Sequence, residues 1–341
     1  MTGPDKTQLL EVRNLRKHFP IQKGFFKKTI GNVRAVDDVS FFVEEGETLG
    51  LVGESGCGKT TTSRCVVRAI APSSGQVLFR AAEGQVVDLA SLDRASLQPL
   101  RPQMQMIFQD PFGSLNPRMN LFEIVGEPLI VNGLANRKQR TEQVAELLQL
   151  VGLRPEYMQR FPHAFSGGQR QRIGIARALS VHPRLVVADE PVSALDVSVQ
   201  AQILNLLLDL QQRLNLTYIF VAHNLSVVKH ICDRVAVMYV GKLVEMAKTG
   251  ELFHKPRHPY TAALMAAVPV ADPRVQSGNV ELKGEVPSPA NPPPGCYFHP
   301  RCAYAVELCR TQPPDFHEIT PGHFVACHHA EEIELPGISL T

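Results

Sequence analysis

Alternating apolar and polar positions open the chain and predict β-strands. Leu9 to Arg16 reads LLEVRNLR, and residues 36–44 alternate in the same way, as half-buried strands do. The polar, lysine-containing stretch between them, Gln22 to Arg34, predicts a surface loop. Thr48 to Val52 is a short apolar run preceded by the turn signal EGE, which predicts another strand.

The middle of the chain changes to a helical pattern. From about Gln109 to Arg160 the strands give way to segments such as TEQVAELLQLV, whose apolar residues have helical spacing. Short β-rich runs return after this region, at Arg184 to Ala188, Leu216 to Ala222 and Arg234 to Tyr239. Short strands separated by helices are typical of an α/β fold with a mostly parallel sheet.

A change in composition divides the last part of the chain from the rest. The segment GEVPSPANPPPG ends at Gly295 and predicts a stiff linker. Four of the seven cysteines follow it. No motif set repeats, so one chain is expected to contain one functional unit, a large domain followed by a small tail.

Composition and charge limit the class of protein. Hydrophobic residues make up 44% and charged residues 20% of the 341 residues, as in globular proteins with a sizeable core. The net charge of +2 gives no argument for nucleic acid as a partner. No apolar run approaches the roughly 18 residues of a membrane helix, and the first residues lack a signal-peptide layout. We therefore expect a cytosolic chain whose cysteines are thiols or metal ligands.

A glycine-rich segment matches a phosphate-binding motif in full. Residues 53–60, GESGCGKT, fit G-x-x-x-x-G-K-[ST] between a predicted strand and a predicted helix, TTTSRCVVRAI. Glycines let backbone N–H groups curl around phosphate oxygens, and the helix N-terminus adds positive potential. This context disfavours the alternative of a chance glycine turn before Lys-Thr. The predicted ATP contacts are Gly53, Glu54, Ser55, Gly56, Cys57, Gly58, Lys59, Thr60 and Thr61.

Three residues of this segment have individual expectations. Lys59 should bridge the β- and γ-phosphates, and the Thr60 hydroxyl should bind Mg²⁺. Cys57 is expected to be a small neutral filler and not a redox group.

Two carboxylates end one of the apolar strands. The segment LVVADE ends in Asp189 and Glu190. Asp189 suits a Mg²⁺ site, directly or through water, and Glu190 can act as general base toward an attacking water. Both could instead cap the helix that begins near Pro191. The presence of the phosphate-binding motif favours the catalytic interpretation.

Further motifs resemble those of ABC transporter ATPases. Residues 165–172, FSGGQRQR, resemble the signature motif of that family. Gln109 opens a segment that resembles the Q-loop, and residues 193–196, SALD, resemble the D-loop. His223 resembles the switch histidine, and Phe19 stands where the family places an aromatic residue against adenine. The resemblance runs from about Leu9 to the C-terminus.

This resemblance implies a fold and a set of roles. The implied fold is a P-loop ABC ATPase core with an antiparallel β subdomain over residues 1–255, a helical subdomain at about 109–170 and a small tail over 256–341. Two subunits would pair head to tail, with each ATP between the phosphate loop of one and the signature motif of the other. The resemblance implies that Glu190, His223 and Gln109 are catalytic and that Phe19 contacts adenine. It implies that the partner's ATP is contacted by Ser166, Gly167, Gly168 and Gln169, and that Asp196 belongs to the D-loop. The implied Mg²⁺ ligands are Thr60, Gln109 and Asp189.

Additional segments narrow the resemblance to peptide importers. These are QDPFGSLNPRM, HPYTAALMAAVP from His258 to Pro269, and the cysteine tail, while SGGQRQRIGIARAL is similar to the second of two ATPases in such systems. The implied protein is a motor at the cytoplasmic face of the inner membrane for dipeptides or oligopeptides. Its implied partners are a sister ABC ATPase, two membrane permeases and an extracytoplasmic solute-binding protein. Alternatives are import of nickel or another small solute, and a soluble non-transport ABC ATPase.

The four cysteines of the tail form a candidate metal site. Cys296, Cys302, Cys309 and Cys327 could hold zinc or an iron–sulfur cluster, or could pack as small hydrophobic residues without metal. Zinc ribbons usually contain close C-x₂₋₄-C pairs, which this tail lacks. The family resemblance implies a [4Fe–4S] cluster. Nearby histidines could substitute as ligands, namely His299, His317, His323, His328 and His329.

Overall fold

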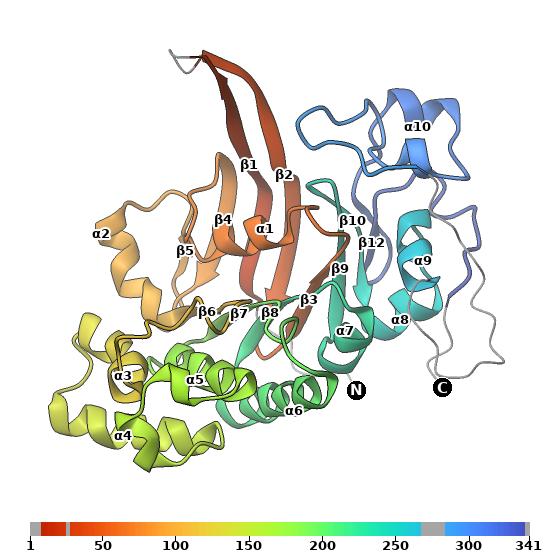
Figure 1. Cartoon of the computed structure of the whole chain (residues 1–341). Helices are drawn as coiled ribbons and strands as arrows, with labels where there is room; N and C mark the ends of the chain where they lie inside the picture. Colours follow the sequence, from red (N-terminus) through yellow and green to blue (C-terminus); the bar gives the residue numbers. More distant parts are fainter. Residues whose placement is uncertain (1–7, 25–27, 267–283, 338–341) are drawn as a thin grey trace. The chain divides into compact units, whose positions relative to one another are not determined.

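The computed structural model describes residues 8–24, 28–266 and 284–337 (Figure 1). The chain forms two compact units, each assembled from separate stretches of sequence. The first unit contains Met1–Leu10, Val43–Glu47 and Leu78–Val221. The second contains Glu11–Phe42, Thr48–Val77 and Ala222–Thr341. In the described part of the chain, every helix is too short or too polar to span a membrane.

Parallel strands form the centre of the first unit. Strands β6 (Met104–Ile107), β7 (Leu185–Asp189) and β8 (Thr217–Val221) pair in that order, and both pairings are parallel. Every residue of β7 and β8 is buried, which explains their near-continuous apolar sequences. The smaller elements of this unit are β5 (Val86–Asp88), α2 (Arg94–Leu97), η1 (Gln98–Gln103), η2 (Pro155–Gln159) and η3 (Pro162–Ala164).

Longer helices follow in the same unit, and those between Gln109 and Arg160 confirm the helical pattern predicted for the middle of the chain. The longer helices are α3 (Leu121–Val131), α4 (Arg137–Leu150), α5 (Gly167–Leu179) and α6 (Val197–Leu214), and Figure 1 shows the first three gathered together. A capping box opens α3, α4 and α5, at Asn120, Asn136 and Ser166 respectively. The N-cap side chain and the third helical residue each satisfy a backbone N–H there, so the sequence fixes where these helices begin.

The second unit combines one parallel pairing with antiparallel ones. Its strands β3 (Thr48–Val52), β9 (Arg234–Tyr239), β10 (Lys242–Lys248), β12 (His323–Val325) and β11 (His317–Thr320) lie side by side in that order. Only β3 and β9 are parallel among these described pairings. Its helices are α1 (Lys59–Val66), α7 (Leu225–Ile231), α8 (Thr249–His254), α9 (Pro259–Ala266), η4 (His299–Arg301) and α10 (Glu307–Thr311).

A long two-stranded ribbon corrects the loop predicted for Gln22 to Arg34. Strand β1 runs over Gln8–Lys23 and β2 over Lys28–Glu44, so most of the predicted loop is strand. The first residues of β2 are exposed or half-buried throughout. Because neither face of the ribbon is buried there, its sequence lacks the alternation that identifies a strand. Strand β4 (Ser74–Arg80) lies beside β1, on the opposite side from β2.

Candidate functional site

The predicted phosphate loop connects β3 to α1 in the second unit. Gly53, Gly56 and Gly58 have φ angles of 146°, 79° and 107°, which favour glycine. A Cβ at Gly58 would also overlap the carbonyl oxygen of Ala35. The loop therefore keeps its shape through glycines whose backbone conformation would strain any other residue, and its last glycine leads directly into the N-terminus of α1.

Lys59 lies folded back over this loop. Its side chain is buried, and Nζ donates hydrogen bonds to the carbonyl oxygens of Gly53 at 2.8 Å and Glu54 at 3.0 Å. The backbone of the predicted phosphate loop thus holds the ammonium in place. Burial raises the pKa of the Cys57 thiol, which agrees with a neutral filler.

Glu54 joins the loop to the C-terminal part of the chain, a connection that the sequence does not reveal. Its backbone N–H donates to the Tyr260 hydroxyl at 2.9 Å. Its two carboxylate oxygens accept from the Arg301 guanidinium at 2.8 and 3.2 Å. Arg301 is 247 residues away in sequence, so no local signal marks the pair.

Two other predicted residues belong to the same unit. Phe19, on β1, is 38% exposed, and the Lys17 ammonium lies 4.9 Å from its ring centroid. His223 is exposed and directly precedes Asn224, whose side chain caps α7. Their predicted roles at adenine and at the γ-phosphate stay predictions.

The two strand-end carboxylates and Gln109 lie in the first unit. Asp189 ends β7 and is buried, 1% exposed. Glu190 follows with φ of 48°, a left-handed conformation that is rare for residues other than glycine and often marks a functional position. The Gln109 Nε2 donates to Glu190 Oε2 at 2.7 Å. The structure therefore brings together two residues that the sequence places 81 positions apart.

The predicted signature residues begin α5 in the same unit. The Ser166 hydroxyl accepts from the Gln169 N–H at 3.4 Å, and Gln169 Oε1 accepts from the Ser166 N–H at 3.1 Å. A Cβ at Gly168 would lie 2.5 Å from a Val199 methyl carbon, so close packing excludes a side chain there. Asp196 is the residue before α6, and its side chain makes no capping bond to that helix.

Comparison with known proteins identifies the family. The family model for ABC transporters matches residues 36–193, and a model for the oligopeptide/dipeptide transporter C-terminal region matches residues 244–309. The oligopeptide transport ATP-binding protein AppF of Bacillus subtilis is 53% identical over 331 residues, which cover 96% of this chain and 99% of that protein. The chain belongs to the ATP-binding proteins of ABC peptide transporters.

Further relatives and solved structures agree with this family. A probable peptide ABC transporter ATP-binding protein of Sinorhizobium fredii is 54% identical over 94% of this chain and 89% of its own length. A dimeric post-hydrolysis state of an ATP-binding cassette with ADP and Pi matches with a TM-score of 0.61 and 26% identity, covering 70% of this chain and 98% of that one. The ABC ATPase has the predicted α/β P-loop fold, and family membership supports ATP hydrolysis with Mg²⁺.

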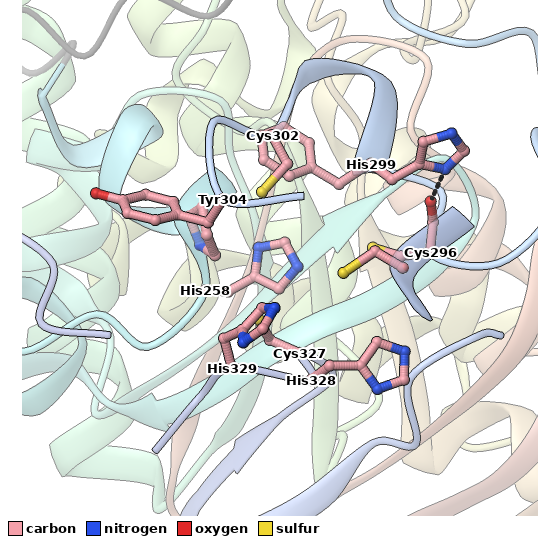
Figure 2. Close-up of a pocket in the computed structure, with 11 residues that line it drawn as sticks. His258, Cys296, His299, Cys302, Tyr304, Cys327, His328 and His329 are labelled. Atoms are coloured by element: carbon pink, nitrogen blue, oxygen red, sulfur yellow. Dashed lines mark hydrogen bonds between the residues drawn. The ribbon is translucent and has the colours of Figure 1, made fainter. Parts of the chain in front are cut away.

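The four tail cysteines of this ABC ATPase line one pocket, shown in Figure 2. The pocket is partly open to solvent. The remaining lining includes the side chains of His258, His299, Tyr304, His328 and His329. Three of the five histidines predicted as substitute ligands therefore reach the pocket, and His258 is an addition that the sequence did not suggest.

The arrangement of these side chains does not support the predicted metal cluster. Within residues 8–24, 28–266 and 284–337, no three or more His, Cys, Asp or Glu side chains are grouped closely enough to hold a metal ion. Burial raises the pKa of Cys296 to about 11 and that of Cys327 to about 12. His323 lies elsewhere, with Nε2 at 2.7 Å from Glu245 Oε1.

Proposed function

We propose that this chain is the ATP-hydrolysing motor subunit of an ABC importer for dipeptides or oligopeptides. The observation that carries the proposal is the phosphate loop, with its glycine-determined shape and the buried Lys59. The peptide substrate is supported by the relatives, which are named as oligopeptide or peptide transport proteins and match nearly the whole chain. Nickel or another small solute is the alternative cargo.

The proposed hydrolysis assigns a role to each of the predicted site residues. Lys59 neutralises charge on the β- and γ-phosphates as the phosphate loop binds them, and the ring of Phe19 packs on adenine. Glu190 accepts the proton of the attacking water, and His223 contacts the γ-phosphate. Gln109 already donates to Glu190, so it can orient this carboxylate and report whether the site is filled.

Magnesium fits the donors available in the chain. Thr60 offers a hydroxyl, Asp189 a carboxylate, and Gln109 an amide oxygen, since its Nε2 is used for Glu190. Oxygen donors of this kind are what Mg²⁺ prefers. The ion would neutralise charge on the phosphates, while the chain's own groups position the water and the nucleotide.

We propose that ATP joins this subunit to a sister ABC ATPase. The start of α5, Ser166 to Gln169, carries a capped helix N-terminus suited to a phosphate on the opposite subunit, and Asp196 would lie near the contact. The dimeric state named for a matching ATP-binding cassette supports pairing. Two membrane permeases would hold the pair at the cytoplasmic face of the inner membrane, with an extracytoplasmic binding protein delivering the solute.

Reconstitution tests the proposed cargo and partners. The tagged chain is isolated from membranes in mild detergent, its co-purifying proteins are identified, and the complex is placed in liposomes. We expect two permeases and a second ABC ATPase, together with ATP-dependent uptake of a labelled tripeptide. Uptake of ⁶³Ni²⁺ without peptide uptake would select the alternative cargo, and ATPase activity without any membrane partner would indicate a non-transport ABC ATPase.

We propose separately that Cys296, Cys302, Cys309 and Cys327 hold a [4Fe–4S] cluster. Four thiols around one pocket are a suitable donor set for such a cluster, and its assembly would draw the four side chains together. The test is iron and acid-labile sulfide content of anaerobically purified protein. We expect about four of each per chain, with a loss in Cys309→Ser but not in Cys65→Ser, which lies outside the pocket. Zinc without sulfide, or no metal, would contradict the proposal.

A further inference from the structure

A buried arginine of the C-terminal region is bonded to the phosphate loop. The Arg301 side chain is 5% exposed and forms a two-point pair with Glu54, the second residue of the loop. Its Nη1 also lies 3.4 Å from the Tyr239 hydroxyl. A two-point guanidinium–carboxylate pair fixes orientation as well as distance, so the geometry of Glu54 depends on Arg301.

The backbone around Arg301 is tightly constrained. Successive hydrogen bonds close the turns from Cys296 to Cys302, namely His299 N–H to Cys296 O at 3.0 Å, Arg301 N–H to Phe298 O at 2.9 Å and Cys302 N–H to His299 O at 3.3 Å. The Phe298 ring packs against Tyr239 and Tyr260, with centroids 5.3 and 5.5 Å away. Arg301 is therefore presented to the loop by a hydrogen-bonded turn that packs against two tyrosine rings.

Glu54 connects this turn to Lys59, the residue proposed to contact the phosphates of ATP. Its carbonyl oxygen accepts from Lys59 Nζ, its N–H is held by Tyr260, and its carboxylate is held by Arg301. A carboxylate on a phosphate-binding loop also repels the anion that the loop must bind. Pairing with a guanidinium offsets that charge and fixes the direction of the carboxylate.

We propose that Arg301 is a positioning residue for ATP, which acts through Glu54 to hold the phosphate loop and to neutralise its carboxylate. The inference rests on the proposed function and deepens it, because it makes the region after the proline-rich linker part of the nucleotide site. Arg301 itself touches no substrate in this account. Its removal should weaken ATP binding more than the chemical step.

The test is steady-state ATP hydrolysis by the full chain in its co-purified complex with the sister ABC ATPase, comparing Arg301→Gln, Glu54→Gln and the double variant with the wild type. We expect Arg301→Gln to raise the KM for ATP about tenfold and to leave kcat within about twofold. Glu54→Gln should raise the KM for ATP less than Arg301→Gln does, since this substitution removes the charge that repels the phosphates. In the double variant the KM for ATP should return most of the way from the Arg301→Gln value toward the wild-type value, because neither an unpaired carboxylate nor an unpaired guanidinium remains.

Controls separate positioning from loss of structure. Arg310→Gln removes an exposed arginine from the same region and should leave KM unchanged. If Arg301→Gln is not recovered folded, Arg301→Lys, which keeps the charge but not the two-point pair, should give an intermediate KM. A wild-type KM in Arg301→Gln, or no recovery in the double variant, would overturn the inference. Absence of ATP turnover in the wild-type complex with the sister ABC ATPase would instead refute the proposed function.

Discussion

The phosphate loop and the cysteine pocket both lie in the second unit, yet they are built in opposite ways. The loop is formed by consecutive residues whose backbone is fixed by glycines with positive φ. The pocket is formed by side chains from separate stretches, around His258, Cys296 to Tyr304, Cys309 and Cys327 to His329. The loop is therefore ready for its ligand, whereas the described pocket side chains are not grouped closely enough for a metal.

This difference teaches where sequence and structure are most informative. A site made of backbone groups is specified by a short motif, and its chemistry follows from that motif. A site made of dispersed side chains depends on packing, and the same cysteines allow several chemistries. The two sites meet at Arg301, which directly precedes Cys302 and is bonded to Glu54.

The largest expected effect tests whether the phosphate loop serves ATP. Lys59→Ala removes the ammonium that rests on Gly53 and Glu54, and the phosphates lose their positive partner. We expect ATP hydrolysis to fall about 100-fold or more. Malachite-green phosphate release measures this, with Lys229→Ala on α7 as an exposed control. Comparable rates in the two variants would mean that the loop does not serve ATP.

A smaller effect tests whether backbone shape specifies the loop. Gly58→Ala places a Cβ against the Ala35 carbonyl at a φ of 107°, and we expect it to reduce the free energy of unfolding by about 2 kcal/mol or more. Gly174→Ala, inside α5, places its Cβ where no neighbouring atom lies within 4 Å. This control should be neutral or slightly stabilising. Urea denaturation compares the two, and equal effects would contradict the role of backbone shape.

The smallest expected effect concerns the hydrogen bond between Asp37 and Tyr297, which anchors the cysteine region, the segment that begins at Cys296. Burial alone would raise the pKa of Asp37, but the Tyr297 hydroxyl at 2.8 Å together with Lys242, His18 and Arg34 lowers it below its ordinary value. The ionised carboxylate is then favoured in the folded state, so its stabilisation is present at neutral pH and is lost as pH falls through that lowered pKa.

Replacing this carboxylate should show the same pH dependence. Asp37→Asn is expected to cost about 1 kcal/mol at pH 7. The difference from the wild type should narrow below about pH 4, where the wild-type carboxylate also becomes protonated. Urea denaturation of both proteins across this range is the measurement. A difference that is constant with pH would show that the charge at Asp37 does not hold the cysteine region.

The sequence predicted the buried strands correctly but missed the exposed part of the β1–β2 ribbon. Thr48 to Val52 was predicted as a strand and is one, because a buried strand must be apolar along its length. Lys28 to Arg34 was predicted as a loop and is strand, because exposure on both faces leaves no pattern. Composition and periodicity report burial, so elements that bury little are hard to recognise.

The candidate site likewise contains residues that the sequence predicted and a contact that only the structure reveals. Ordered motifs predicted the phosphate loop and the carboxylates, and the structure adds the bond between Gln109 and Glu190. The pairing of Glu54 with Arg301 joins residues 247 positions apart and has no sequence motif of its own. Such pairs depend on how distant segments pack, which a single sequence does not record.

The central claim, that this ABC ATPase hydrolyses ATP with Glu190 as the general base, is tested most directly by Glu190→Gln. This change keeps the size of the side chain but removes the proton acceptor. ATP binding and single-turnover hydrolysis are measured in the same preparation of the full chain in complex with its sister ABC ATPase. The account predicts nearly unchanged ATP affinity with hydrolysis about 100-fold slower or more. Hydrolysis at the wild-type rate would contradict it.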